Sequence, residues 1–222
     1  MTESERLSSL VGQVYDAVLD PTLWPKALEE SARFVSGSAA GLYWQNPVSK
    51  TGNAPYTFGL EPHYVRLYFD QYIKLNPVIA HVCLAKIGET FATIDFYRFD
   101  EFVQTRFYKE WAQPQGFIDS VGAVLDRSGM TAAGLVVFRH QRDGMSDDET
   151  RRRMRLIVPH VRRAVLIDRV IDLHSAEAMS FAEILDGISA GLFLVDRYSC
   201  GTGADILVLW NWLCSLPRAT AL

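Results

Sequence analysis

The sequence has no long hydrophobic run, no cysteine pattern and no excess of positive charge. The apolar run at 206–214 is less than half of the ~20 residues that cross a bilayer, and no secretory signal precedes the chain's first helix, so we expect no membrane contact. Cys83, Cys200 and Cys214 are odd in number and lack metal-ligand spacing, which favours reduced thiols in a cytoplasmic protein. A net charge of −4 provides no basic field for phosphates, so we expect no nucleic-acid contact from this chain itself.

Motifs for catalysis and metal binding are missing too. The five histidines form no HExxH arrangement, and the chain has no GxSxG, P-loop or GxGxxG motif. The carboxylate pairs Glu29/Glu30 and Asp147/Asp148 are expected on exposed helix faces. Solvation accounts for such charges without a catalytic role. No nucleophile is paired with a base. We therefore predict a protein that is not an enzyme and has neither a metal site nor a cofactor.

What the sequence does have is the composition of a globular protein. Of 222 residues, 49% are hydrophobic and 22% charged, enough for one domain of ordinary size and a fragment of another. The hydrophobic periods predict helices at 4–19, 24–35, 61–75 and 100–111, and strands at 39–45, 54–58, 88–94, 117–126 and 132–140. This order predicts an α+β fold, a GAF- or PAS-like sandwich in which an antiparallel sheet carries helices on its faces, followed by a long connector helix.

The predicted connector helix covers residues 146–186, with Ser146 and Glu149 at capping-box spacing and Pro159 expected to bend it rather than end it. Apolar residues recur there in steps of three and four. Two interpretations stay open: a connector shared between two protomers, or one amphipathic helix lying on its own domain. The first predicts a homodimer with this contact seam: Met154, Ile157, Val161, Ala164, Asp168 and Ile171.

These patterns divide the chain into three parts. Residues 1–145 are expected to form a sensory α+β domain and residues 146–186 the connector and dimerisation helix. Residues 187–222 resemble the start of a PAS-like segment followed by an aberrant tail.

Aromatic side chains gather on what the pattern predicts to be one face of the sheet: Tyr43, Tyr56, Tyr64, Tyr68, Tyr72, Phe91 and Trp111. Phenol and indole groups bury apolar area while keeping a hydrogen-bonding group, which suits a pocket for a small molecule. The same residues would also form an aromatic core that has no cavity. The sequence alone leaves both interpretations open.

Residues 62–72, followed by Asn76-Pro77-Val78, resemble the ligand-binding stretch of LuxR-type transcriptional regulators. Residues 14–24 and 154–164 are similar to the sensory halves of such regulators, and the likeness covers about residues 5–195. Trp111-Ala112 with Gly116-Phe117 is similar to the segment that leads into that family's late strands.

The resemblance implies a pocket for an unidentified small ligand. Tyr64 falls where the family has a lactone-contacting Trp, Tyr68 keeps the family's Tyr, and Phe91 falls near a second family Trp. Asn76 lies near the family's Asp, and an amide can donate as well as accept, whereas a carboxylate only accepts. Together with the aromatic group, the expected ligand-binding set is Tyr43, Tyr56, Tyr64, Tyr68, Tyr72, Asn76, Phe91 and Trp111.

Residues 184–196 resemble the opening helix and first strand of a PAS-like module, but no helix-turn-helix follows them. The resemblance therefore implies the sensory and dimerisation part of a LuxR-type regulator, truncated before its DNA-binding domain, with DNA contact expected only of a full-length relative. The alternative is a structural protein-interaction module with a filled aromatic core and no ligand.

Overall fold

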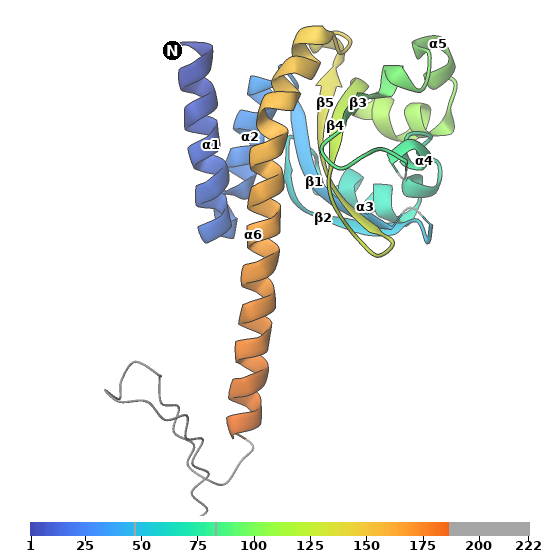
Figure 1. The fold of residues 1–222 in the computed structure, drawn as a ribbon. Helices are drawn as coiled ribbons and strands as arrows, with labels where there is room; N and C mark the ends of the chain where they lie inside the picture. Colours follow the sequence, from blue (N-terminus) through green and yellow to red (C-terminus); the bar gives the residue numbers. More distant parts are fainter. Residues whose placement is uncertain (47, 83, 187–222) are drawn as a thin grey trace, which may run out of the picture. The chain divides into compact units, whose positions relative to one another are not determined.

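The computed structural model describes residues 1–46, 48–82 and 84–186, and the expected PAS-like segment and tail at 187–222 lie outside these ranges. Residues 1–169 form one compact unit. Its centre is a five-stranded sheet in the order β2-β1-β5-β4-β3, in which all neighbours are antiparallel (Figure 1). The strands are β1 (Ala39–Asn46), β2 (Thr51–Phe58), β3 (Thr90–Ala92), β4 (Phe117–Ser128) and β5 (Thr131–His140).

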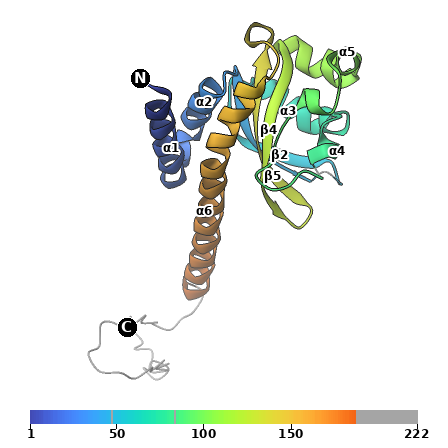
Figure 2. The same cartoon turned by 45° about the horizontal axis from the view of Figure 1, so that its top comes forward.

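Helices cover both faces of this sheet. On one face lie α1 (Glu3–Leu19), α2 (Trp24–Phe34) and the first half of α6 (Asp148–Asp186) (Figure 2). On the other lie α3 (Pro62–Asp70), α4 (Ile79–Val82), α5 (Phe99–Phe102) and a π-helical turn, Tyr108–Ala112. The predicted fold class, an α+β sandwich in which an antiparallel sheet carries helices on its faces and a long helix follows, is confirmed.

The face under α1, α2 and α6 carries the main hydrophobic core. Alternation along the strands directs every second side chain to it, for example Ala40 and Leu42 of β1. Its largest fully buried members are Trp24, Leu28, Leu42, Leu125, Leu135, Met154 and Ile157. The fold therefore holds α6 to the sheet by apolar burial.

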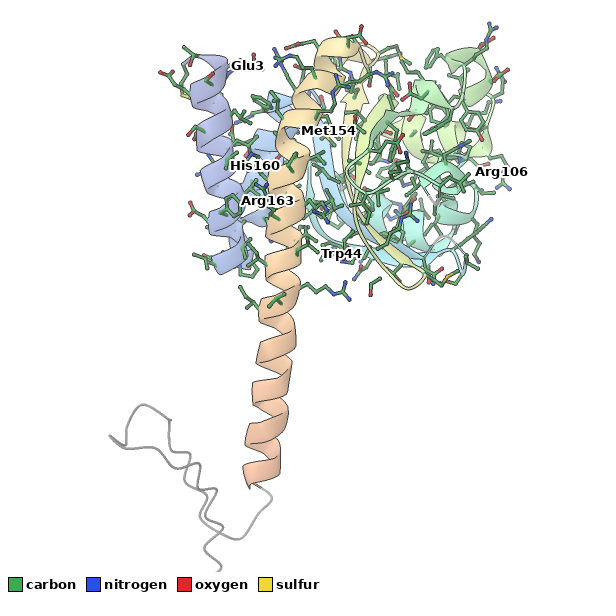
Figure 3. The ribbon with its side chains drawn as sticks, viewed as in Figure 1. Glu3, Trp44, Arg106, Met154, His160 and Arg163 are labelled. Atoms are coloured by element: carbon green, nitrogen blue, oxygen red, sulfur yellow. The ribbon has the colours of Figure 1, made fainter. Side chains whose placement is uncertain are left out.

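Packing in this core shows that most of the predicted dimer seam is wrong. Four of the seam residues are at most 1% exposed and pack in this core, so they cannot meet a second chain: Met154 (Figure 3), Ile157, Val161 and Ala164. For this part of α6 the second interpretation, an amphipathic helix on its own domain, is right. A helix packing on a sheet needs the same three-and-four spacing as a helix packing on another helix. Asp168 is half-buried, and Ile171 remains exposed.

The start of α6 differs from the predicted capping box. The helix begins at Asp148, and the Asp147 carboxylate accepts hydrogen bonds from the Thr150 backbone N–H (2.7 Å) and hydroxyl (2.6 Å). These bonds lower the pKa of Asp147. Ser146 does not cap the helix; its backbone N–H donates to the Asp119 carboxylate at 2.8 Å. The helix continues through Pro159, as predicted.

The predicted helix over 100–111 is interrupted. Thr105 is the physical reason, because its hydroxyl donates to the Phe102 carbonyl (2.7 Å) and accepts from the Tyr108 N–H (3.1 Å), in place of the regular helical pattern. The chain therefore forms the short α5 and then the π-helical turn that carries Trp111.

A buried arginine joins these elements. Arg139, near the end of β5, is 4% exposed, and a guanidinium has five N–H donors that need partners. Nε and Nη1 donate to oxygens at the end of α2, in the turn before α6 and in its first turn: Ser36 O (2.8 Å), Val35 O (3.4 Å), Gly144 O (2.8 Å) and Thr150 Oγ1 (3.2 Å). Nη2 donates to the Asp143 carbonyl.

Replacing this guanidinium should destabilise the domain strongly. Arg139→Met keeps a long apolar side chain but leaves buried carbonyl oxygens without donors, so we expect the free energy of unfolding to fall by about 3 kcal/mol. Urea denaturation followed by circular dichroism measures it. Arg98→Met is the matched control, because the Arg98 side chain is 78% exposed and should change the free energy by less than about 0.5 kcal/mol. Equal effects of the two substitutions would contradict the role given to Arg139.

Candidate ligand-binding site

The aromatic face of the sheet contains a cavity of about 80 Å³. Strands β1, β4 and β5 form its floor, and α3, α4, α5 and the π-helical turn close it. Most of its lining is aromatic or aliphatic: Tyr43, Tyr68, Val78, Ile79, Val82, Phe91, Phe102, Phe107, Trp111, Ala112, Phe117, Val136 and Phe138. The remaining lining residues are polar: Gln45, Asn76, Thr93, Asp119 and Ser120. A mostly apolar hollow with a few polar groups is the usual composition of a small-molecule site.

The structure brings five of the eight predicted ligand-binding residues to this cavity: Tyr43, Tyr68, Asn76, Phe91 and Trp111. The Tyr68 ring contacts two of the others, with centroid distances of 6.1 Å to Tyr43 and 5.3 Å to Trp111. Side chains from β1, α3, β3 and the π-helical turn thus meet at one place.

The other three predicted residues do not line the cavity. Tyr56 lies on the opposite face of the sheet, where its ring stacks on Trp24 at a centroid distance of 5.7 Å. The Tyr72 hydroxyl donates to the Glu110 carboxylate at 3.1 Å. Tyr64 contributes its backbone carbonyl, which accepts from Trp111 Nε1 at 2.9 Å and so holds the indole in the wall of the cavity.

Several lining residues were missed by sequence reasoning. Strand alternation could have found Gln45, two residues after Tyr43, and Phe138, two residues after Val136, because such pairs share a face. Thr93, Phe102, Phe107 and Ser120 had no such signal. They are brought together by connections that the pattern did not predict, including the interruption at Thr105.

Tyr68 is the centre of a hydrogen-bond network in the cavity wall. Its hydroxyl oxygen lies 3.0 Å from Asn76 Nδ2 and 3.3 Å from Gln45 Nε2. Asn76 Oδ1 accepts from the Val78 N–H at 3.0 Å, which fixes the orientation of this amide. Two amides and a phenol carry five donor hydrogens between them, and the two hydrogen bonds use only two. In either orientation of the Gln45 amide, the network has donors that no acceptor among the described residues uses, and they are available to an oxygen in the cavity.

Both phenols of this wall stay neutral at physiological pH. Burial raises the pKa of Tyr68 to about 12, although hydrogen bonds from Asn76 and Gln45 act in the opposite direction. Burial, and secondarily the nearby Tyr68, raises the pKa of Tyr43 well above its usual value. Neutral phenols can donate as well as accept hydrogen bonds.

Two glycines leave room for the aromatic rings. A Cβ at Gly41 would lie 2.7 Å from Cε2 of Tyr43, so this ring leans back over β1 only because residue 41 has no side chain. A Cβ at Gly122 would approach the Phe91 ring to 3.1 Å. Both glycines therefore help to shape the cavity wall.

Metal and membrane features are not found in the described part of the chain. Within residues 1–46, 48–82 and 84–186, no three His, Cys, Asp or Glu side chains gather as a metal site would require. Over the same residues, no helix combines the length and apolar character needed to span a bilayer.

Comparison with known proteins identifies the fold. No protein-family model matches the sequence, and no curated protein matches it. The structure is similar to the VqsR LBD domain from Pseudomonas aeruginosa, with a TM-score of 0.59 and 13% identity over 72% of this chain and 94% of that chain. It is also similar to the phycoerythrobilin-bound GAF domain from a cyanobacterial phytochrome, with a TM-score of 0.52 and 12% identity over 78% and 98%. The chain thus has the fold of GAF-like sensory ligand-binding domains.

Removing the Tyr68 hydroxyl should destabilise the cavity wall. Tyr68→Phe takes an acceptor from the Asn76 and Gln45 amides, so we expect the free energy of unfolding to fall by about 1–2 kcal/mol. Urea denaturation measures it. Tyr64→Phe is the matched control, because this hydroxyl makes no hydrogen bond to the described residues and its removal should cost less than about 0.5 kcal/mol. A Tyr68→Phe protein as stable as wild type would show that the network contributes nothing.

Proposed function

We propose that this chain is a sensory domain that binds a small ligand in the aromatic cavity and reports its presence through α6. The single observation that supports this most is the donor-rich network of Tyr68, Asn76 and Gln45 in the wall of a mostly apolar hollow. Tyr68 is only 4% exposed, so the polar groups around it gain from a hydrogen-bonding partner in the cavity. The GAF-like fold adds support, since VqsR LBD is a ligand-binding domain and the phytochrome GAF domain is bilin-bound.

The cavity limits the ligand by size and chemistry. At about 80 Å³ the cavity is smaller than the ~300–1,000 Å³ of sites for drug-sized compounds. It therefore fits a ligand with a single ring or a short chain. The ligand is apolar over most of its surface, to match the aromatic lining. One hydrogen-bond acceptor of the ligand, such as a carbonyl oxygen, faces Tyr68 and Asn76.

The proposed function is not enzymatic. In the described chain, no His, Cys, Lys or Arg lines the cavity to act as a nucleophile or base. Both oxygens of Asp119 accept backbone N–H bonds, from Ser120 and Ser146. Binding chemistry is therefore better supported than catalysis.

The regulator context is part of the proposal. Residues 62–78 resemble the ligand-binding stretch of LuxR-type regulators, and the structural likeness to VqsR LBD agrees with that resemblance. We propose that the domain acts in the cytoplasm as the ligand-sensing and dimerisation part of such a regulator, in which DNA contact belongs to a separate domain.

For the homodimer we propose a contact on α6 that shares only Ile171 with the predicted seam. Ile167, Val170 and Ile171 are 44%, 51% and 41% exposed, and their spacing of three and four puts them on one face of α6. A second copy of the chain that packs its own α6 on this face would cover these side chains.

A ligand screen tests the sensory function. In a thermal-unfolding assay with benzamide, phenol, toluene and N-butanoyl-homoserine lactone as probes, we expect benzamide, a single ring with a carbonyl, to raise the melting temperature by about 5 °C near 100-fold its Kd. Toluene has no acceptor and should have a smaller effect. Tyr68→Phe should reduce the benzamide shift, and Tyr56→Phe, on the opposite face of the sheet, should keep it. If no probe shifts the melting temperature of any of these proteins, a structural module with a filled aromatic core is the better account.

Light scattering coupled to size-exclusion chromatography tests the dimer. Changing both Ile167 and Ile171 to Lys places charges on the proposed contact, so we expect wild type to run as a dimer and the double variant as a monomer. Leu84→Lys is the matched control, because Leu84 is an apolar residue that is 85% exposed elsewhere on the surface. A wild-type chain that stays monomeric at all concentrations, or a double variant that still dimerises, would reject this contact.

A further inference from the structure

A pair of hydroxyls lies in the cavity wall away from the Tyr68 network. Thr93 Oγ1 and Ser120 Oγ are 2.9 Å apart, and both residues line the cavity. Thr93 follows β3 and is only 3% exposed, and Ser120 is on β4. In such a pair one hydroxyl donates to the other, and the second proton has no acceptor among the described residues. The pair can therefore bind an oxygen of a ligand in the cavity.

Ser120 connects this pair to the start of α6. Its backbone N–H donates to Asp119 Oδ1 at 2.8 Å, and Asp119 Oδ2 accepts from the Ser146 N–H at the same distance. Asp119 is 3% exposed, so water does not compete for its oxygens. One buried carboxylate thus joins the strand that holds Ser120 to the residue two positions before α6.

Thr93 connects the pair to α6 by a second route. It begins the 3-10 turn Thr93–Asp95, and Asp95 Oδ2 accepts both the Ala92 N–H (2.7 Å) and Arg151 Nη1 (2.6 Å). Arg151 lies in the first turn of α6. Burial raises the pKa of Asp95, but the hydrogen bonds from Arg151 and Ala92 outweigh it and leave this pKa lowered, so the ion pair is charged at neutral pH.

We propose that the Thr93–Ser120 pair is the element that couples the cavity to α6, through Asp119 to Ser146 and through Asp95 to Arg151. The proposal rests on the proposed sensory function, because it names the part of the cavity wall whose rearrangement would reach the helix. A ligand shifts a conformational equilibrium only if it binds its states unequally. The pair offers such a contact, since a ligand oxygen that accepts its free proton binds best when that hydroxyl points into the cavity, and so favours one arrangement of Thr93 and Ser120.

Hydrogen–deuterium exchange on the full chain tests the coupling without any ligand. In the Thr93→Val/Ser120→Ala double variant we expect amides of residues 146–153 to exchange about fivefold faster or more, while those of 157–165 stay within about twofold of wild type. Thr93→Ser keeps the hydroxyl and should exchange like wild type. Should the double variant fail to fold, Ser120→Ala alone is expected to show the change in 146–153.

A second hydroxyl pair serves as the matched control. Ser49, in the exposed turn between β1 and β2, and Thr51, the first residue of β2, have hydroxyl oxygens 2.7 Å apart and touch neither route. Ser49→Ala/Thr51→Val should leave exchange in 146–153 unchanged. The proposal is overturned if the Thr93/Ser120 variants change this segment by less than twofold, or if the control changes it as much.

A double-mutant cycle separates coupling from general loosening. Arg151→Gln alone should accelerate exchange in 146–153, and adding Thr93→Val should accelerate it by less than the product of the two single effects, because both act through Asp95. Independent, multiplicative effects would overturn the Asp95 route. Since no ligand is used, failure here would leave ligand binding standing, and failure of the ligand screen would leave the coupling standing.

Discussion

The fold depends on the Arg139 guanidinium. It lies at the end of β5, where α2 ends and α6 begins, and its N–H groups donate to backbone oxygens of Val35, Ser36 and Gly144. These carbonyls belong to turns, which have no sheet or helix partner to satisfy them, so a single buried cation replaces several missing hydrogen bonds. The same group contacts Thr150 in the first turn of α6. The guanidinium thereby adds to the apolar burial that holds α6 against the sheet.

The sheet separates two kinds of interior. Under α1, α2 and the first half of α6 the core is aliphatic, with Trp24 as its largest side chain, and Met154 and Ile157 fit closely against the strands. On the opposite face the packing is aromatic and leaves a cavity. The hydrogen bond between Asn76 and Tyr68 would be lost if the walls moved together, and this opposes collapse of the cavity. A change in the cavity must cross or go around the sheet to reach α6, and the Asp119 and Asp95 carboxylates provide that connection.

Much of the fold could be predicted from the sequence, because its main elements follow simple periods. The helices α1 and α2 and the strands β1, β4 and β5 were predicted within a few residues. Predictions were wrong where a single residue decides the local structure. The alternation of side chains along β2 puts Tyr56 on the face opposite the cavity. The Thr105 hydroxyl interrupts the helix predicted over 100–111. The same spacing of apolar residues suits a helix that packs on a sheet and a helix that packs on a second chain. Met154 and Val161 were therefore assigned to a dimer contact, whereas they pack in the core of their own domain. Five predicted ligand-binding residues meet at the cavity because they share aromatic character and a face, whereas Thr93 and Ser120 required the tertiary structure.

The central claim is that the aromatic half of the domain encloses space that a small molecule can occupy. The most direct measurement is a high-resolution crystal structure of the full chain exposed to benzamide. The account predicts density for one ring among Tyr43, Tyr68 and Trp111, with the carbonyl oxygen within hydrogen-bond distance of Tyr68 or Asn76. Side chains that close the hollow, leaving no density between these rings, would contradict it.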